Sequence, residues 1–395
     1  MRPTLSPRTR ARRFLLAMLV AGCGGGAPSD QPRSLAPHAH VDGPMDMAAR
    51  SMMDGQADVP ASLRPAPADA HPGQWLLMSH HNHSGYLDGR KALTTMMQAA
   101  RNAGLDAMSL TDHNTMKGTL SQEFQNPGDL VMVRGMEWGA LREQGETVLG
   151  HACLLGLEGD QPIETHFSLD QMLTEATERK ATIVINHPFT NNNQWLQPDP
   201  DPRAHAVEVW NHWWALVSPI IHNNEALAWW NKALARGQRL TAFGGTDNHG
   251  HFYDDIDKPT NMVLAEQREP AALQAAIRRG HVSVLASARA ARPVLEVDAD
   301  GDGRYEVLQG EDLVLSGRLA RLKVRIRVQG GKGLTALLIS KRGVLTRRRL
   351  DQANAEVLID VAARAADEGF LRVELRKHPD RWWSMTALTN PVYLR

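Results

Sequence analysis

Cysteine is nearly missing from this chain of 395 residues, and its scarcity excludes two kinds of protein. The two cysteines, Cys23 and Cys153, cannot form the disulfide framework of a small secreted domain or the thiolate cluster of a cysteine-rich zinc module. Stability must therefore come from packed apolar cores. With 42% hydrophobic residues, the chain is long enough for two such domains and a tail.

An excess of charge of one sign is also missing. The sequence has 44 basic and 44 acidic residues, so its formal net charge is zero. Proteins that bind nucleic acid through a broad surface rely on a clear excess of Lys and Arg. The composition therefore predicts no nucleic-acid partner.

The apolar stretch of the N-terminal region, residues 14–21, is too short to cross a bilayer. Arginines precede it, and the residues VAGC at positions 20–23 resemble the lipobox of a bacterial lipoprotein. We therefore expect a signal peptide over residues 1–22 and a lipid anchor on Cys23. The protein would then be exported and membrane-anchored, on the periplasmic or cell-envelope face. The alternative is an ordinary cleaved signal peptide with an incidental cysteine.

The remaining chain falls into three parts by composition and pattern. Residues 23–73 are rich in Gly, Pro, Ala, Ser and Asp without lasting periodicity, which predicts a flexible linker. Residues 75–290 alternate short apolar runs with amphipathic stretches, and this succession of strand and helix predicts a parallel α/β domain. Residues 291–395 contain short alternating runs separated by Gly and Asp, which predict a small all-β sandwich.

The α/β part has recognisable element boundaries. Strands are expected at residues 75–78, 107–110, 131–133, 181–185, 206–209 and 240–243, and helices at residues 92–102, 168–179, 224–235 and 270–279. Ser168 and Gln171 form a capping box at the start of one helix, and Gly104 and Gly280 suit helix ends.

Histidine is what the sequence has in abundance, with 17 residues. Imidazole is the commonest metal ligand near neutral pH. Many of the histidines, with several acidic residues, directly follow predicted strands: His81-Asn82-His83, Asp112-His113, Glu137, His187-Pro188 and Asp247-Asn248-His249, joined by His151 and Asp88. Because active sites of α/β barrels are built at the carboxyl ends of the strands, we expect these side chains to meet there.

The residue types at this rim point to metal-assisted hydrolysis. His81 and His83 alternate along an extended segment, so both can reach one ion, and Glu137 can bridge two. Mixed imidazole and carboxylate donors suit Zn, Mn or Fe, and two or three such ions can activate a water. Each motif alone also has an ordinary explanation, such as an exposed histidine or a helix-capping aspartate. Their number at one rim favours the metal site.

The order HNHS, TDHN, GMEWG, GH, NHP and GGTDNH resembles the PHP (polymerase and histidinol phosphatase) superfamily. That resemblance implies a distorted (β/α)7 barrel with a site for two or three metal ions, here followed by the β-sandwich. The segments VEVWN at residues 207–211 and TNPVYL at residues 389–394 are similar to the CehA/McbA branch, named for carbaryl hydrolases. The resemblance extends from about residue 75 to the C-terminus.

The resemblance also implies roles for individual residues. The implied metal ligands form three sets: His81, His83, Glu137 and Asp247 for a first ion; Glu137, His151 and His187 for a second; and Asp88, His113 and His249 for a third ion or as the catalytic acid–base groups. Asp112 would orient His113 rather than bind metal. His113 and His249 are equally eligible to protonate the leaving group.

Together these features predict a metal-dependent hydrolase that acts on a small phosphate, carboxylic or carbamate ester. The alternative is a non-catalytic surface lipoprotein that uses the barrel to bind a ligand or sequester metal. A nuclease is disfavoured, because the protein is expected to be exported and lacks a basic excess.

Five tryptophans lie close together in the sequence. We expect Trp210, Trp213 and Trp214, which follow a predicted rim strand, to line a substrate cleft. Trp229 and Trp230 are expected to pack in the core beneath the following helix.

Overall fold

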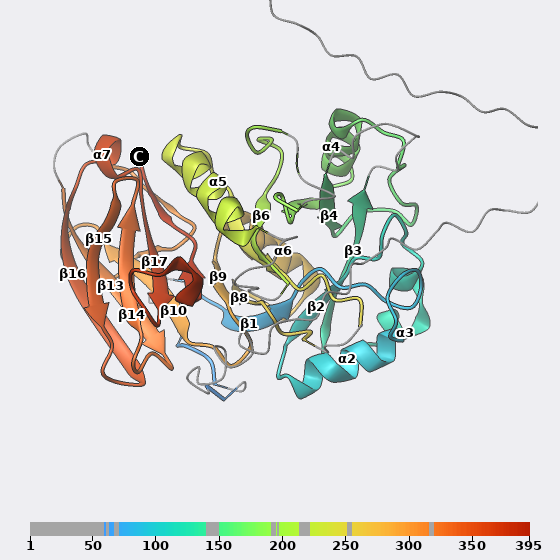
Figure 1. Ribbon diagram of the computed structural model, residues 1–395, viewed down its shortest axis with the longest axis horizontal. Helices are drawn as coiled ribbons and strands as arrows, with labels where there is room; N and C mark the ends of the chain where they lie inside the picture. The colour runs from blue at the N-terminus through green and yellow to red at the C-terminus, as the bar shows by residue number, and fades with distance from the viewer. Residues whose placement is uncertain are drawn as a thin grey trace, which may run out of the picture. The chain divides into compact units, whose positions relative to one another are not determined.

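The computed structural model describes residues 59–60, 63–66, 71–139, 150–190, 195, 197–212, 222–250, 255–315 and 320–395 (Figure 1). The predicted signal peptide and Cys23 lie outside these residues, as do Trp213 and Trp214. Within the described ranges, no helix combines the length and the apolar character needed to cross a membrane. The described residues all belong to one compact unit.

Seven neighbouring strands carry the first half of the fold. They are β1 (Gln74–Ser79), β2 (Ala107–Leu110), β3 (Val131–Gly139), β4 (His151–Leu155), β5 (Thr182–Asn186), β6 (Ala206–Asn211) and β7 (Thr241–Gly245), adjacent in this order. β1, β2 and β3 are parallel to one another, as are β5, β6 and β7. β4 runs antiparallel to both of its neighbours, which differs from the all-parallel prediction. An antiparallel return needs no crossover helix, and none is described between β3 and β4.

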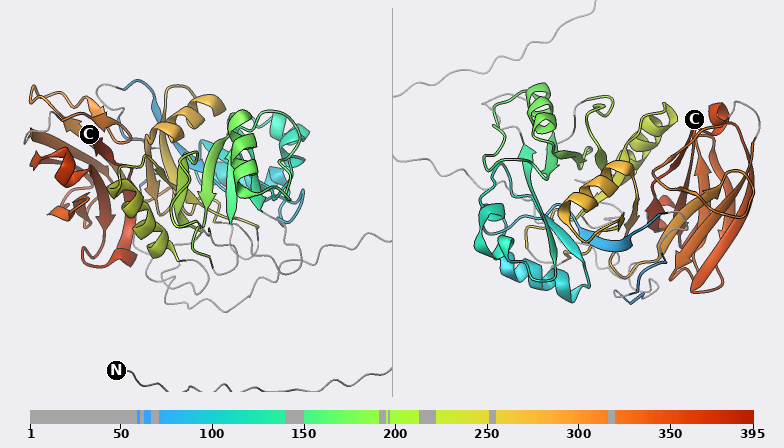
Figure 2. Two further views of the ribbon diagram at one scale, coloured as in Figure 1. Left: turned by 90° about the horizontal axis from the view of Figure 1, so that it is seen from above. Right: turned by 180° about the vertical axis from the view of Figure 1, so that it is seen from behind.

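The helices flank these strands (Figures 1 and 2). They are α2 (Leu93–Asn102), η1 (Gly118–Leu120), α3 (Gln122–Gln125), α4 (Leu169–Glu178), α5 (Asn223–Ala235) and α6 (Pro270–Arg279). The predicted capping box of Ser168 and Gln171 is present at the start of α4. Gly280 follows α6 with a φ of 84°, which glycine adopts without the cost that a Cβ imposes.

The chain beyond β7 closes the ring of strands, and helix α6 packs against one end of it. Asn82 pairs with Asn248, and the backbone N–H of Thr246 donates to the carbonyl of His80, so the chain after β7 returns to the chain after β1. Buried side chains from all seven strands form one core cluster with Leu273 and Ile277 of α6. Because α6 fills one end, polar side chains gather at the other end. The observed class is mixed α/β; the strict (β/α)7 repeat stays a prediction.

Two antiparallel strands, β8 (Thr260–Ala265) and β9 (Val282–Leu285), extend the sheet from β1 toward the second half. The strands of that half are β10 (Arg292–Asp298), β11 (Val307–Leu308), β12 (Asp312–Leu313), β13 (Ala320–Gln329), β14 (Thr335–Ser340), β15 (Gly343–Arg349), β16 (Asn354–Ala363), β17 (Phe370–Arg376), β18 (Met385–Thr389) and β19 (Val392–Leu394), with short helices α7 (Ala365–Glu368) and η2 (Trp382–Ser384).

The second half is joined to the first through one sheet. β11, β10, β13 and β16 form a four-stranded sheet, whereas β18 pairs with β9 and so continues the large sheet of the first half. The strands of this half thus form one sheet of their own and also lengthen the sheet of the first half. The predicted boundary at residue 291 falls between β9 and β10.

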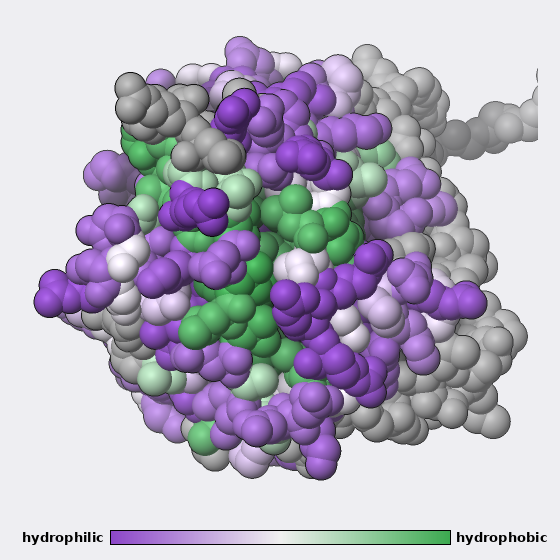
Figure 3. Space-filling view, turned by 90° about the vertical axis from the view of Figure 1, so that its left-hand side faces the viewer, coloured by the Kyte–Doolittle hydropathy of each residue, from purple (hydrophilic) through white to green (hydrophobic). Residues whose placement is uncertain are grey.

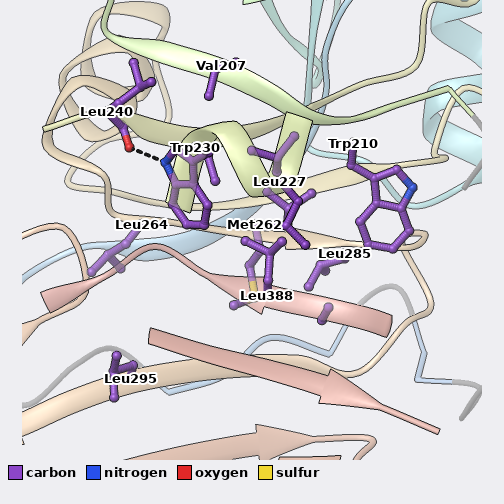
Figure 4. Packing of buried hydrophobic residues seen from close by; sticks show 14 of the residues in the cluster. Val207, Trp210, Leu227, Trp230, Leu240, Met262, Leu264, Leu285, Leu295 and Leu388 are labelled. Atoms are coloured by element: carbon purple, nitrogen blue, oxygen red, sulfur yellow. Dashed lines mark hydrogen bonds between the residues drawn. The ribbon is translucent and has the colours of Figure 1, made fainter. Parts of the chain in front are cut away.

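The core at this junction is centred on helix α5 (Figure 4). Trp230 is fully buried among residues of both halves, including Leu388 of β18, and its indole N–H donates to the carbonyl of Leu240 at 2.8 Å. Trp229 is also buried, so the prediction for these two tryptophans is confirmed. The cleft prediction for Trp210 is wrong. Its side chain is 1% exposed and belongs to the same core, because its position in β6 points it inward.

Part of the predicted linker packs onto the fold instead of remaining free. Val59 is buried, and its backbone N–H donates to the carbonyl of Arg289 at 3.1 Å. The guanidinium of Arg64 pairs with Asp106. The composition of the segment does not reveal these contacts, because they depend on only two residues, Val59 and Arg64.

The surface of the sandwich side is mostly hydrophilic, with a stripe of hydrophobic residues across the face shown in Figure 3. Leu358 of β16 is 59% exposed, and Val344 of β15 is 39% exposed. Neither Leu358 nor Val344 belongs to a group of candidate metal ligands.

Candidate metal centre

All nine predicted ligands lie together at the end of the ring opposite α6. β1, β2, β5 and β7 deliver their residues just beyond their carboxyl ends, and Glu137 lies within β3. His151 is the first residue of β4. Because β4 is antiparallel, its amino end lies at the same rim, so the unexpected strand direction is what places His151 there.

The carboxylate of Glu137 is the hub of the site. It is fully buried, and five imidazoles contact its two oxygens. The contacts to Oε2 come from His81 Nε2 at 3.1 Å, His83 Nε2 at 3.3 Å and His113 Nδ1 at 3.1 Å, and those to Oε1 from His151 Nδ1 at 3.0 Å and His187 Nε2 at 3.2 Å. This arrangement lets one carboxylate serve more than one ion.

The remaining predicted residues stand on the more exposed side of the hub. Asp247 Oδ1 lies 3.5 Å from His81 Nε2 and 3.5 Å from His83 Nε2. Asp88 Oδ2 lies 3.3 Å from His249 Nε2 and 3.7 Å from His113 Nε2. The side chains of Asp88 and Asp247 are 33% and 23% exposed, so a substrate can approach from this side.

The backbone is contorted at the rim. His81, His187 and Asp247 have φ values of 64°, 21° and 50°, in the left-handed region that side chains with a Cβ rarely adopt. The pair His81 and His83 therefore converges through a turn, rather than through the strand alternation expected from the sequence. Such conformations persist where surrounding contacts hold them, and they are concentrated at functional sites.

Several buried atoms of the hub have no hydrogen-bond partner among the described residues. They are His81 Nε2, His83 Nε2 and Glu137 Oε2. Burying polar atoms without partners is costly, and a cation between these donors would satisfy all three. The donor set of imidazole nitrogens and carboxylate oxygens is the one that Zn, Mn and Fe prefer. The residues thus fit the metal ions that the sequence predicts.

The electrostatics of the hub agree with a site built for positive charge. Burial raises the pKa of Glu137, but the imidazoles of His113, His81 and His151 outweigh it and hold this pKa well below its usual range. Burial lowers the pKa of His81, yet the carboxylates of Glu137, Glu208 and Asp247 more than reverse this and raise it. The buried carboxylates stabilise a positive charge at this place, either a proton on an imidazole or a metal ion.

The ligand atoms fall into four overlapping groups, each within reach of one ion. The groups are His81, His83 and Asp247; His81, Glu137 and His187; His113, Glu137 and His151; and His83, Asp88, His113 and His249. The first and last sets resemble the first and third sets expected from the sequence. The expected second set is divided between two groups: Glu137 and His187 belong to one, and Glu137 and His151 belong to the other. Both histidines nevertheless contact the same oxygen of Glu137.

Three further residues support the site, and sequence reasoning missed or misread them. Glu208 of β6 accepts from His81 Nδ1 at 2.8 Å, and Asn186 Nδ2 donates to Glu137 Oε1 at 2.8 Å. The available signal for Glu208 was a charged residue within the apolar run AVEVW. Asp112 was expected to orient His113. Its carboxylate instead accepts from the hydroxyl and the backbone N–H of Ser84, and so fixes the turn after His83.

Comparison with known proteins identifies part of this region. Residues 79–199 match the family model of the PHP domain. No curated protein matches the sequence. The structure is similar to a two-domain protein of Bacteroides vulgatus that contains a predicted PHP-like metal-dependent phosphoesterase, at 16% identity and a TM-score of 0.46, over 84% of this chain and 100% of that one. It is also similar to an amidohydrolase of Chromobacterium violaceum, at 14% identity and a TM-score of 0.32, over 45% of this chain and 89% of that one.

The PHP domain match covers the motifs up to His187 and ends before Asp247 and His249. The structure nevertheless brings those two residues to the same cluster. At identities of 16% and 14%, the similarities to solved structures do not indicate a reaction.

Proposed function

We propose that the protein is a metal-dependent hydrolase that cleaves a phosphate, carboxylic or carbamate ester of a small molecule. The observation that carries the proposal is the Glu137 carboxylate, buried under five imidazoles with unpartnered donor atoms facing it. The PHP domain match over residues 79–199 supports a metal-dependent hydrolase. The finer assignment to the CehA/McbA branch rests on the segments at residues 207–211 and 389–394.

The nine side chains of the rim would hold two or three divalent ions of Zn, Mn or Fe. When bound, such ions lower the pKa of water and neutralise the negative charge that develops on the substrate oxygens. Glu137 would belong to two of the ligand groups. Asn186 holds the Glu137 carboxylate in place by its hydrogen bond to Oε1.

With two ions bound, Asp88 and His249 would be free of metal and would be the groups that move a proton. His249 Nδ1 lies 3.1 Å from the carbonyl oxygen of Asp247, so Nδ1 donates, while Nε2 faces Asp88 Oδ2 at 3.3 Å. From this position His249 could pass a proton to the leaving group. His113 turns Nδ1 toward Glu137 at 3.1 Å, which suits a ligand better than an acid.

The test compares hydrolytic activity before metal removal, after chelation and after metal ions are added back. The purified full chain is assayed on nitrophenyl phosphates, phosphodiesters, carboxylic esters and carbamates, before and after treatment with a strong chelator. We expect turnover of at least one class, loss of it on chelation, and recovery with Zn, Mn or Fe. Activity that survives complete metal removal would contradict the proposal. Bound metal with no turnover on the whole panel would favour the non-catalytic binding module instead.

We also propose that the mature protein is attached to a membrane on the periplasmic or cell-envelope face through a lipid on Cys23. The support is the arrangement of arginines, apolar residues and VAGC in residues 1–23. Expression of the full chain in bacteria, followed by fractionation, tests this. The membrane fraction should lose the protein when Cys23→Ala is introduced.

A further inference from the structure

One buried carboxylate near the site is absent from the proposed ligand set. Glu208 lies in the middle of β6 and is 0% exposed. Its Oε1 lies 2.8 Å from His81 Nδ1. Its Oε2 accepts from the backbone N–H of His187 and from Asn211 Nδ2, both at 2.8 Å. One side chain therefore receives three donors, two of which belong to proposed metal ligands.

These contacts determine which nitrogen of His81 can bind a cation. A carboxylate only accepts hydrogen bonds, so Nδ1 of His81 carries the proton shared with Glu208. The lone pair of Nε2 then faces Glu137 Oε2 at 3.1 Å and Asp247 Oδ1 at 3.5 Å. Histidines that ligate metals are commonly oriented by a carboxylate on the other nitrogen.

The same carboxylate holds the backbone of the second ligand. His81 and His187 both have positive φ, at 64° and 21°. The hydrogen bond from His187 N–H to Glu208 Oε2 fixes the turn that directs His187 Nε2 to Glu137 at 3.2 Å. His81, Glu137 and His187 form one of the ligand groups, and Glu208 contacts two of its three members.

The neighbouring strand leaves room for this carboxylate. A Cβ added at Gly245 of β7 would lie 1.8 Å from Glu208 Oε1, which is far inside van der Waals contact. Gly245 thus permits a charged side chain to occupy the interface between β6 and β7. The packing is shaped around Glu208, which argues against an incidental polar residue in an apolar strand.

We propose that Glu208 is a positioning residue that fixes the tautomer of His81 and the turn at His187, and so builds the cation site of His81, Glu137 and His187. The inference rests on the proposed metal binding and adds a residue outside the ligand set. It predicts that Glu208 controls the affinity of one ion, while an ion held by the more exposed group around Asp88 is unaffected.

Zinc titration of the metal-stripped full chain tests the proposal, with thermal melting recorded for every variant. Glu208→Gln keeps the size of the side chain but can no longer accept at both oxygens. We expect one ion to bind about 10- to 100-fold more weakly in this variant, with the remaining ions unchanged. Glu296→Gln is the matched control, because Glu296 is an equally buried glutamate on β10 in the sandwich. It should retain the zinc affinity of the wild type.

Asn211→Ala provides a second variant with an intact carboxylate. It removes one donor to Oε2 and should weaken the same ion by a few-fold, in the same direction. This variant decides the question if Glu208→Gln does not fold, because unchanged affinity in a folded Asn211→Ala would then overturn the proposal.

The outcomes separate this inference from the proposed function. A wild-type chain that binds no zinc, manganese or iron would overturn both. Wild-type zinc binding with full affinity in a folded Glu208→Gln would overturn the positioning role and leave the proposed function standing. An equal loss of affinity in Glu296→Gln would reduce the role of Glu208 to general stability and would also overturn the inference.

Discussion

Buried carboxylates occur in both halves of the molecule, and their partners differ. In the sandwich, Glu296 pairs with Arg325 and Arg327 at 3.0 and 2.8 Å, and Glu374 pairs with Arg372 at 2.7 Å. At the rim of the first half, Glu137 is surrounded by imidazoles with contacts of 3.0 to 3.3 Å. Both arrangements bury negative charge, but among the described residues it is the sandwich carboxylates that contact permanently charged guanidinium groups.

The comparison shows how to distinguish a structural cluster from a binding site. A guanidinium is always charged and donates hydrogen bonds, so the sandwich carboxylates are neutralised by the fold itself. An imidazole is a donor or an acceptor according to its protonation, and Glu137 Oε2, His81 Nε2 and His83 Nε2 lack hydrogen-bond partners among the described residues. Added positive charge would satisfy these atoms of the rim, whereas Glu296 and Glu374 of the sandwich already contact arginines.

The largest expected effect is at the hub of the rim. Glu137→Gln removes the charge shared by two ligand groups while keeping the shape of the side chain. We expect hydrolysis to fall by at least about a thousandfold, as for groups that act as a unit, together with lower metal content per chain. Steady-state kinetics and elemental analysis check this. Wild-type metal content in the variant would show that Glu137 is not a ligand.

The mirror experiment in the sandwich should affect folding alone. Glu296→Gln leaves Arg325 and Arg327 without their carboxylate in a mostly buried position. We expect a loss of about 3 kcal/mol in the free energy of unfolding, at the low end for a broken buried pair because both arginines reach solvent. Denaturant unfolding measures it. Activity of the folded variant should equal that of the wild type, and a parallel loss of activity would break the comparison.

A histidine away from the rim, His205, gives a pH dependence of stability that is independent of the candidate metal centre. Burial, with a smaller effect of Arg278, lowers the pKa of His205 from 6.5 to about 4, and its Nδ1 accepts from the N–H of Ile183. The unfolded chain therefore takes up the proton first. The contribution of His205 to the free energy of unfolding is fully present above pH 6.5 and is lost as the pH falls toward 4.

His205→Asn keeps an acceptor and cannot titrate, so it should remove this decline. We expect wild type and variant to differ by roughly 1 kcal/mol more at pH 7 than at pH 4, after allowance for the partial exposure of the ring. Denaturant unfolding at both pH values measures the difference, and the contribution of the metal centre cancels between the two proteins. A difference that does not change with pH would show that His205 is not neutral in the fold.

The smallest expected effect comes from a site outside both clusters. Ser168→Ala removes the hydroxyl that caps α4. In the wild type this hydroxyl accepts a hydrogen bond from the N–H of Gln171. The free energy of unfolding should fall by about 1 kcal/mol, with unchanged activity and metal content at 25 °C. Loss of metal in this variant would mean that general destabilisation, rather than a specific ligand, empties the rim.

Local patterns predicted much of the first half. The strand at Ala107–Leu110 was expected at the same residues, and helix α6 was expected at its observed bounds. Apolar periodicity and end signals such as Gly280 are local, so they can be read without the fold. The nine rim residues were found the same way, because each follows a strand or lies within a short motif. Their roles as ligands stay predictions.

The parts that were missed depend on contacts between distant residues. Strand β4 was not expected, because its direction is set by pairing with β3 and β5 rather than by its own residues. Glu208 carries no local signal for its partner His81, which lies 127 residues earlier. Trp210 was assigned to a cleft because it ends a rim strand, yet the packing of α5 and β9 buries it.

The most direct test of the whole account is the location of metal by anomalous diffraction from crystals of the wild-type chain. The account predicts two or three peaks among the imidazoles around Glu137, with His81 bound through Nε2 and no peak at the arginine–glutamate pairs of the sandwich. A metal-free protein in which the rim histidines are hydrogen-bonded only to the surrounding carboxylates would contradict it.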